Sequence, residues 1–169
     1  IFALQRDQDA ILLVSPSDHI IPNTSAIHSA IIKGLPEVKK GNIITFGITP
    51  TRAETGYGYL QLGEIINDDL IKLKQFVEKP NVAAAESMLK SGDFLWNSGI
   101  FLFRAKDLVD GFRIHAPEIL SPVKHSVRNG TADLGFWRLN PQDWAKTKSI
   151  SLDVALMEKS QNLVVVPFS

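Results

Sequence analysis

Short apolar runs alternate along the chain with amphipathic segments of helical periodicity, and this alternation constrains the fold more than any other feature. The runs at residues 10–14, 42–48 and 163–166 are rich in branched apolar side chains, which is typical of buried strands. Because strands separated by helices are usually joined by crossover connections, the pattern favours an α/β fold with a mostly parallel sheet.

One part of the chain breaks this alternation. Residues 59–64 and 71–77 both read as strands, and Asn67, Asp68 and Asp69 between them are typical of a tight turn. We therefore expect an antiparallel hairpin within the sheet. The expected sheet is mixed rather than wholly parallel.

Capping residues predict where the helices begin and end. Asn23 or Thr24 begins a helix that Gly34 and Pro36 are expected to end or kink. The other expected elements are helices at residues 81–90, closed by Gly92, at 106–112 and at 117–127, a strand within 96–103, and a helix from Ser149 or Ser151 to residue 158 or 159.

Composition excludes several classes of function. The 169 residues, 44% of them hydrophobic, are enough for one domain with its own core. The 18 basic and 18 acidic residues give a formal net charge of zero, which argues against binding nucleic acid or an anionic membrane. No apolar run is long enough to span a bilayer, and the absence of cysteine excludes thiolate metal sites.

The ends of the sequence look internal to a domain. The chain begins at Ile1 without a methionine and stops at Ser169, directly after an apolar run that reads as a buried strand. We therefore expect residues 1–169 to be the central and C-terminal part of one domain that is incomplete at both ends.

The tripeptide Glu78-Lys79-Pro80 is the first candidate site, because it follows the apolar run that ends at Val77. Proline cannot donate to a sheet ladder, so the charged pair is expected at a strand exit, where α/β sheets place ligands. A carboxylate can accept hydrogen bonds from sugar hydroxyls, and an ammonium suits a phosphate. The alternative is a solvated surface ion pair.

Three further segments carry candidate residues. Asp18, after the first strand, could hold a divalent cation beside phosphates, or it could be a turn aspartate. Gly58, in Gly-Tyr-Gly, could let a ligand approach the backbone, or it could form a simple turn. Asn97 could bind a sugar hydroxyl, or it could bond to the backbone of its own turn. The glycines match neither a P-loop nor a Rossmann fingerprint, and the four histidines lack metal-ligand spacing.

Taken in this order, the segments resemble bacterial mannose-1-phosphate guanylyltransferases, within the sugar-1-phosphate nucleotidyltransferase superfamily. The resemblance spans nearly the whole chain. The matching stretches are residues 13–19 (LVSPSDH), 45–48 (TFGI), 54–59 (ETGYGY), 76–80 (FVEKP), 95–101 (LWNSGIF) and 151–158 (SLDVALME).

The resemblance implies a Rossmann-like nucleotidyltransferase fold and a cytoplasmic enzyme that makes GDP-mannose and pyrophosphate from GTP and mannose 1-phosphate with Mg²⁺. It implies that Asp18 is a catalytic magnesium ligand and that Lys79 is a catalytic residue that holds the sugar phosphate. Gly58 would offer its backbone to the sugar, while Glu78 and Asn97 would bind the sugar through their side chains. Homo-oligomer formation and a fused phosphomannose isomerase domain stay open.

Two features of the family have no counterpart in residues 1–169. These are the glycine-rich loop that cradles the nucleotide phosphates, and the second magnesium aspartate. We therefore expect the 169-residue chain by itself to be inactive. Two rival hypotheses are a catalytically silent sugar-nucleotide-binding module and a related pyrophosphorylase with another sugar or nucleotide.

Overall fold

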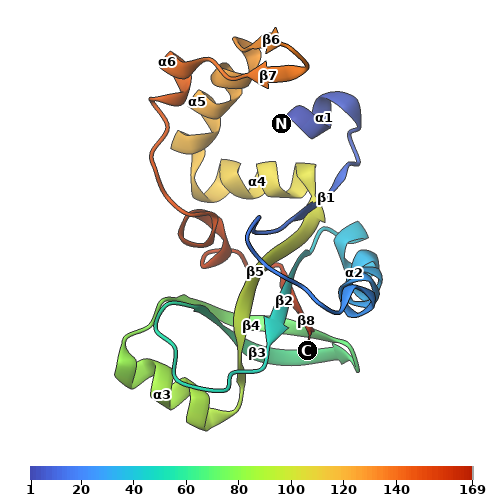
Figure 1. The fold of residues 1–169 in the computed structure, drawn as a ribbon, viewed down its shortest axis with the longest axis vertical. Coiled ribbons are helices and arrows are strands. Elements are labelled where there is room, and N and C mark those ends of the chain that lie inside the picture. The colour runs from blue at the N-terminus through green and yellow to red at the C-terminus, as the bar shows by residue number, and fades with distance from the viewer. Residues whose placement is uncertain (169) are drawn as a thin grey trace. The chain divides into compact units, whose positions relative to one another are not determined.

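The computed structural model describes residues 1–168, which divide into two compact units (Figure 1). The first unit consists of Ile1–Ala10 and Ala105–Lys159, and the second consists of Ile11–Arg104 and the residues from Ser160 on. The prediction of a single nucleotidyltransferase domain over residues 1–169 stays a prediction. Each unit is described separately below.

The second unit is built on a mixed sheet whose strand pairings close into a circuit. β5 pairs with β2, β2 with β8, β8 with β4, β4 with β3, and β3 again with β5, while β1 pairs with β5 outside this circuit. The strands are β1 (Ile11–Val14), β2 (Ile43–Ile48), β3 (Gly58–Asn67), β4 (Leu70–Glu78), β5 (Phe94–Arg104) and β8 (Leu163–Pro167).

The mixed α/β architecture is confirmed, but the expectation of mostly parallel strands is wrong. Within residues 1–168, β2 and β8 form the parallel pair of this sheet, and its other pairings are antiparallel. The crossovers through α2 (Thr24–Lys39) and α3 (Val82–Ser91) do join strands that run in the same direction. An antiparallel strand separates the strands of each crossover, because β5 lies between β1 and β2 and β3 lies between β4 and β5.

Helix α2 packs closely on one face of the sheet. A Cβ atom added at Gly34 would lie 3.1 Å from two side-chain carbons of Ile44, so glycine permits this close approach. The expected end of the helix at Gly34 and Pro36 is wrong, because α2 continues to Lys39, while the alternative of a kink there stays a prediction. Pro36 is tolerated because the carbonyl that loses its partner belongs to Ile32, on the exposed side of the helix. The core under α2 contains Ile27, Ala30, Val38, Ile44, Phe46, Ile100, Leu102, Val164 and Val166.

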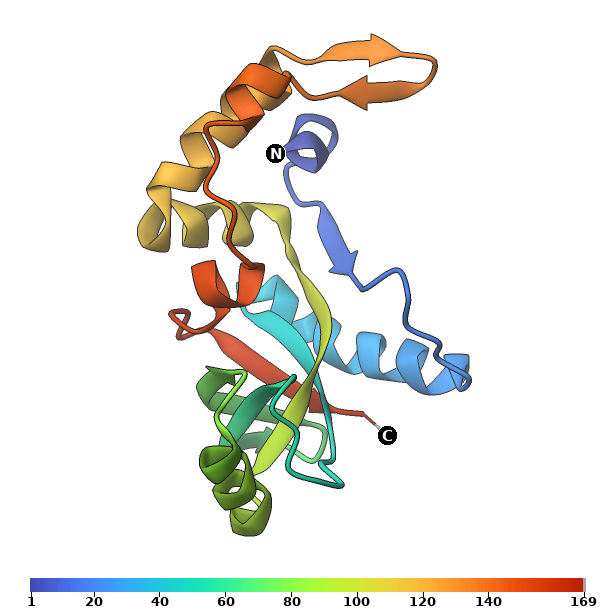
Figure 2. The same ribbon diagram turned by 60° about the vertical axis from the view of Figure 1, so that its left-hand side comes forward.

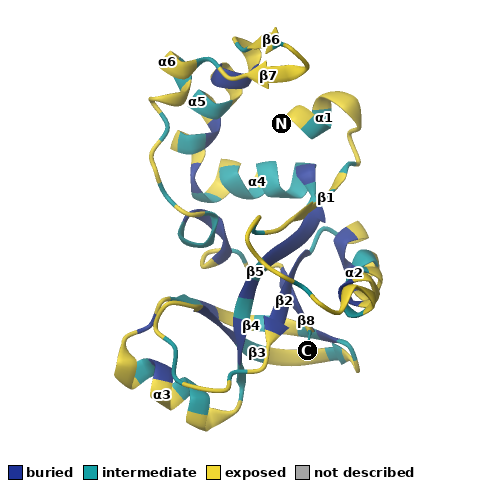
Figure 3. Cartoon of the chain, in the orientation of Figure 1, coloured by how far each residue is buried: buried dark blue, intermediate teal, exposed yellow. Residues whose placement is uncertain are grey.

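Helix α3 has the predicted caps and covers another part of the sheet (Figure 2). The Asn81 side chain accepts a hydrogen bond from the Ala84 N–H at 2.9 Å, and Gly92 ends the helix with a left-handed backbone at φ 76°. Ala85 of α3 packs in one buried cluster with Tyr59 and Trp96. Buried residues are concentrated on the strands of this unit (Figure 3).

The first unit is mainly helical and contains elements that the sequence patterns did not predict. α4 and α5 were expected, whereas α1, the β6–β7 hairpin and α6 are too short to give a periodic signal. The elements are α1 (Phe2–Arg6), α4 (Ala105–His115), α5 (Pro117–Arg128), β6 (Thr131–Asp133), β7 (Phe136–Arg138), α6 (Pro141–Trp144) and the π-helical turn η1 (Asp153–Met157). In the described part of the chain, no helix has both the length and the apolar character needed to cross a membrane.

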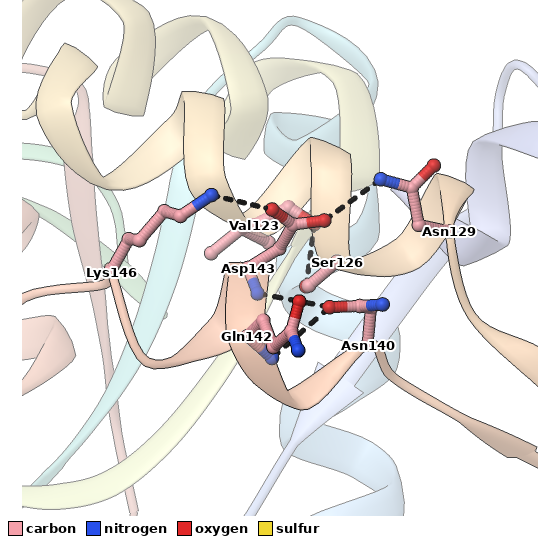
Figure 4. Close-up of polar contacts among 7 residues, drawn as sticks. All are labelled: Val123, Ser126, Asn129, Asn140, Gln142, Asp143 and Lys146. Atoms are coloured by element: carbon pink, nitrogen blue, oxygen red, sulfur yellow. Dashed lines mark hydrogen bonds and ion pairs between the residues drawn. The ribbon is translucent and has the colours of Figure 1, made fainter.

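Polar side chains tie α5 to α6 (Figure 4). Asn140 accepts hydrogen bonds from the N–H groups of Gln142 and Asp143, both at 3.0 Å, and so begins α6. The Asp143 carboxylate in turn accepts from Asn129 at 2.8 Å and from Lys146 at 2.9 Å. These bonds, with that of Asn129 the strongest influence, hold the pKa of Asp143 below its ordinary value.

The helix expected to end at residue 158 or 159 is only a π-helical turn. The expected serine cap is wrong, because the residue at the N-cap position is Leu152, although the Ser151 hydroxyl just before it accepts from the Val154 N–H at 3.3 Å. Residues 155–157 are all buried, and one face of a regular amphipathic helix would not bury three consecutive side chains. The expected length of this helix was therefore wrong.

Glu37 is a nearly buried carboxylate that closes the turn between α2 and β2. Its Oε1 accepts a hydrogen bond from Lys40 Nζ at 2.6 Å, and its Oε2 accepts one from Asn42 Nδ2 at 2.7 Å. The hydrogen bond from Lys40 is the main cause that holds the pKa of Glu37 below its ordinary value, against the opposing effect of burial.

We expect Glu37→Gln to lower the free energy of unfolding by about 1–3 kcal/mol at neutral pH, because the amide cannot accept from both partners. Since the folded-state pKa of Glu37 is lowered, its contribution is present above the ordinary glutamate value of about 4.5 and is lost as the pH falls through the folded-state value. Urea unfolding of both proteins at neutral and acidic pH measures this. A difference that persists unchanged in acid would contradict it, and the exposed Glu86→Gln is the control.

Candidate functional site

The strand register brings three of the predicted site residues into one row across the sheet. Gly58 of β3 pairs directly with Glu78 of β4. On the other side of β3, Tyr59 pairs with Trp96 of β5, and the same antiparallel register continued by one position sets Gly58 beside Asn97. Gly58, Glu78 and Asn97 therefore form a row, called the polar row below, that crosses the first residue of β3, the last residue of β4 and the interior of β5.

A buried apolar row supports this polar row. Two positions along each strand, Leu60 pairs with both Phe76 and Leu95, and all three side chains are buried. Because side chains two residues apart point to the same face of a strand, the polar row shares the face of this apolar row. The intervening Tyr59 and Trp96 point to the opposite face, which α3 covers. The polar row thus ends a packed core.

Gly58 is required by the carboxylate beside it. A Cβ atom at this position would lie 2.8 Å from Glu78 Oε2 and 3.2 Å from two ring carbons of Phe76. Glu78 lies against the Gly58 backbone with only 15% of its side chain exposed. The predicted approach of a ligand to the Gly58 backbone stays a prediction, and the group that lies against this backbone here is the Glu78 carboxylate.

Lys79 follows the row in a strained backbone conformation. Its φ of 47° lies in the left-handed region, which costs a residue with a Cβ atom about 1–2 kcal/mol. Its N–H donates to the Tyr57 carbonyl at 3.2 Å, and its Nζ lies 3.3 Å from Glu78 Oε1. The ammonium group remains accessible, since 64% of the side chain is exposed. Strain of this kind is concentrated at functional sites.

Asn97 is held by bonds to its carbonyl oxygen. Oδ1 accepts from the Thr45 hydroxyl at 2.9 Å and from the Gly99 N–H at 3.1 Å. The turn bond that the sequence left open as an alternative is therefore present. Sequence reasoning missed Thr45, although it is the polar residue inside the apolar run of β2 and is fully buried.

Asp18 lies in a hollow separate from the carboxylate of the polar row. It lines a pocket of about 490 Å³ together with Ser98, and the preceding Pro16 lies against Gly99, whose added Cβ would be 3.3 Å from Pro16 Cγ. The turn that carries Asp18 is thus beside the Asn97 segment of β5. The other residues that line the pocket are His19, Ile20, Ile21, Pro22, Asn23, Ile48, Ile100 and Phe168.

The described residues could bind a magnesium ion only if other ligands complete its coordination. No group of three or more histidine, aspartate or glutamate side chains within residues 1–168 could enclose a metal ion. Asp18 is exposed and offers a single carboxylate. Mg²⁺ at nucleotide sites commonly takes one or two carboxylates and completes its shell with phosphate oxygens and water. Asp18 therefore fits a metal ion that arrives with a phosphorylated ligand.

The loop before β3 contributes a group of residues that sequence reasoning did not single out. The Arg52 guanidinium lies 5.5 Å from the centroid of the Trp96 ring, and it donates two hydrogen bonds to Glu54. An arginine and a glutamate two residues apart in a polar loop gave only a weak signal.

Comparison with known proteins assigns this fold to a family of transferases. The family model described as nucleotidyl transferase matches residues 1–147, so the chain belongs to the nucleotidyl transferase family.

Curated relatives narrow the class. The chain is 42% identical over 159 residues to mannose-1-phosphate guanylyltransferase of Sinorhizobium fredii, covering 94% of this chain and 31% of that protein. It is 40% identical over 161 residues to mannose-1-phosphate guanylyltransferase RfbM of Salmonella typhimurium, covering 95% of this chain and 34% of that protein. The chain thus spans about a third of the length of these relatives.

Solved structures agree with the fold. A crystal structure described as mannose-6-phosphate isomerase from Helicobacter pylori superposes with a TM-score of 0.88 at 31% identity, over 99% of this chain and 65% of that one. One described as mannose-1-phosphate geranyltransferase from Thermus thermophilus gives 0.82 at 30% identity, over 98% and 47%. The nucleotidyltransferase fold and the resemblance to mannose-1-phosphate guanylyltransferases are confirmed.

Proposed function

We propose that the protein containing this chain transfers a guanylyl group from GTP to mannose 1-phosphate and releases GDP-mannose and pyrophosphate in the cytoplasm. The observation that carries the proposal is the polar row of Gly58, Glu78 and Asn97 with Lys79 at its end. These residues occur in a chain whose curated relatives are named for this activity.

The polar row suits the sugar end of mannose 1-phosphate. Glu78 accepts hydrogen bonds from sugar hydroxyls, Asn97 binds a further hydroxyl, and Gly58 allows the sugar to approach the backbone. Lys79 turns its ammonium from Glu78 to the phosphate. The ammonium can make this exchange because 64% of the Lys79 side chain is exposed, and Glu78 then accepts hydrogen bonds from sugar hydroxyls in place of Lys79.

The reaction needs positioning and neutralisation of charge rather than a covalent intermediate. A phosphate oxygen of mannose 1-phosphate forms a bond to the α-phosphorus of GTP while the bond from that phosphorus to the bridging oxygen breaks. The leaving group is pyrophosphate. Lys79 orients the attacking phosphate and offsets its charge. Asp18 would hold Mg²⁺, which neutralises charge on the triphosphate when bound.

Turnover in the full-length protein tests the proposal. Pyrophosphate release and GDP-mannose formation are measured with GTP, mannose 1-phosphate and Mg²⁺, and we expect both products in equal amounts. A panel with glucose 1-phosphate, N-acetylglucosamine 1-phosphate, ATP and UTP measures selectivity. A higher kcat/KM with another pair of substrates would favour a related pyrophosphorylase. Binding without turnover of any pair would favour a silent module.

A further inference from the structure

An ionic and aromatic stack fixes the loop of residues 49–57 that leads into β3. The Trp96 ring, only 7% of whose residue surface is exposed, has the Arg52 guanidinium 5.5 Å from its centroid. The Tyr57 ring meets Trp96 edge-on, with centroids 5.2 Å apart. The start and end of this loop are therefore held against the same indole.

Glu54 locks the middle of the loop. Its Oε2 accepts from Arg52 Nε at 3.2 Å and from an Arg52 terminal nitrogen at 3.1 Å, while its Oε1 accepts from the Gly56 N–H at 3.1 Å. The Glu54 N–H donates to the Tyr59 hydroxyl at 2.9 Å. The Gly56 N–H is the main cause that holds the pKa of Glu54 below its ordinary value.

Tyr57 and Trp96, the two aromatic residues of the stack, are linked directly to residues of the polar row or to Lys79. Tyr57 directly precedes Gly58, and Trp96 directly precedes Asn97. The Tyr57 carbonyl also accepts the N–H of Lys79, whose left-handed backbone needs such support. A shift of the loop would therefore move the groups that face a sugar phosphate.

We infer that Arg52 and Glu54 are positioning residues that hold Tyr57, and through its carbonyl Lys79, in the geometry that binds a hexose 1-phosphate. This inference rests on the proposed function of the polar row. Neither side chain needs to touch the ligand, because both act through Trp96 and Tyr57.

The expected effect follows from the strength of the stack. The Arg52 side chain is 60% exposed, and a cation over an aromatic ring at an exposed site contributes about 0.5–1 kcal/mol, which corresponds to about a two- to fivefold change in affinity. Arg52→Met, which removes both the charge and the fork, should therefore raise the KM for mannose 1-phosphate about two- to fivefold. Arg52→Lys should raise this KM less than Arg52→Met does, because it keeps a cation over Trp96. Glu54→Gln should also raise this KM, but by less than Arg52→Met does.

The experiment measures kcat and KM for each substrate, calorimetric binding of mannose 1-phosphate, and Tm in the full-length protein. The KM for GTP should change less than twofold, since the stack is joined through Tyr57 and Trp96 to the residues that are proposed to bind the sugar phosphate. Matched controls are Lys72→Met and Glu64→Gln. These two residues form an exposed ion pair, 2.6 Å between Lys72 Nζ and Glu64 Oε2, in the half of the β3–β4 hairpin that is nearer its turn.

Equal rises in both KM values with a large fall in Tm would overturn the inference, as they would indicate a purely structural role. Unchanged binding of mannose 1-phosphate in Arg52→Met would overturn it as well. Wild-type protein that binds mannose 1-phosphate without turnover would defeat the proposed function alone. The calorimetric comparison of the variants would then still decide whether Arg52 and Glu54 position the ligand.

Discussion

Replacing Lys79 with asparagine is expected to raise the KM for mannose 1-phosphate by about 10- to 100-fold, because a hydrogen bond to a charged group contributes about 1.5–3 kcal/mol. The free energy of unfolding is expected not to fall. Lys79 adopts a φ of 47°, and asparagine enters this left-handed region more readily than lysine does. Steady-state kinetics and urea unfolding of the full-length variant measure the two effects.

Measured together, the KM and the free energy of unfolding distinguish loss of the phosphate contact from general damage to the fold. General damage to the fold would lower the free energy of unfolding together with the affinity for mannose 1-phosphate. Lys74→Asn removes the same charge from an exposed position of β4, the strand that Lys79 directly follows, and should leave the KM for mannose 1-phosphate near the wild-type value. An unchanged KM in Lys79→Asn would mean that the ammonium does not hold the phosphate.

Gly58→Ala is expected to lower kcat/KM for mannose 1-phosphate at least tenfold and to lower the free energy of unfolding by about 1–3 kcal/mol. The new methyl group would lie 2.8 Å from Glu78 Oε2 and 3.2 Å from the buried Phe76 ring. The carboxylate is the part that can move, so it leaves the polar row. Kinetics and denaturant unfolding measure both losses.

Two companion variants separate the causes. Gly56→Ala is the matched control, because its added carbon would have only Glu54 Oε1 close by, at 3.4 Å. In a double-mutant cycle, Glu78→Ala should recover part of the stability that Gly58→Ala loses. Full additivity of the two changes would show that the methyl group and the carboxylate do not collide.

Local signals in the sequence predicted local structure well. The Asn81 cap and the Gly92 end of α3, and the turn at Asp68 between β3 and β4, follow from the chemistry of one or two residues. The predicted end of α2 was wrong because tertiary packing overrides the local signal of Gly34 and Pro36. The strand β2 packs on Gly34, and the Pro36 defect falls on the side of the helix that faces water.

The parts of the site that could be predicted are those whose residue types are unusual at a strand end. Gly58, Glu78, Lys79 and Asn97 stood out in this way, and strand register then brings them together. The hydrogen bonds and strand pairings that hold these residues in place could not be predicted. The bond from Thr45 to Asn97 joins residues far apart in the sequence, and a sheet pairing that inserts β3 between β4 and β5 leaves no local signal.

The circuit of strand pairings also determines an order of assembly during synthesis. Ile43 pairs with Leu163, so one edge of β2 stays without its partner until a strand made much later arrives, and contacts between such distant residues form slowly. β3, β4 and β5 are all synthesised earlier, so Gly58, Glu78 and Asn97 can reach their register on the nascent chain. Until β8 arrives, the edges of β2 and β4 that it will cover are open to pairing with other chains. The residues of the polar row can thus align before the core closes, and aggregation is the hazard until β8 is in place.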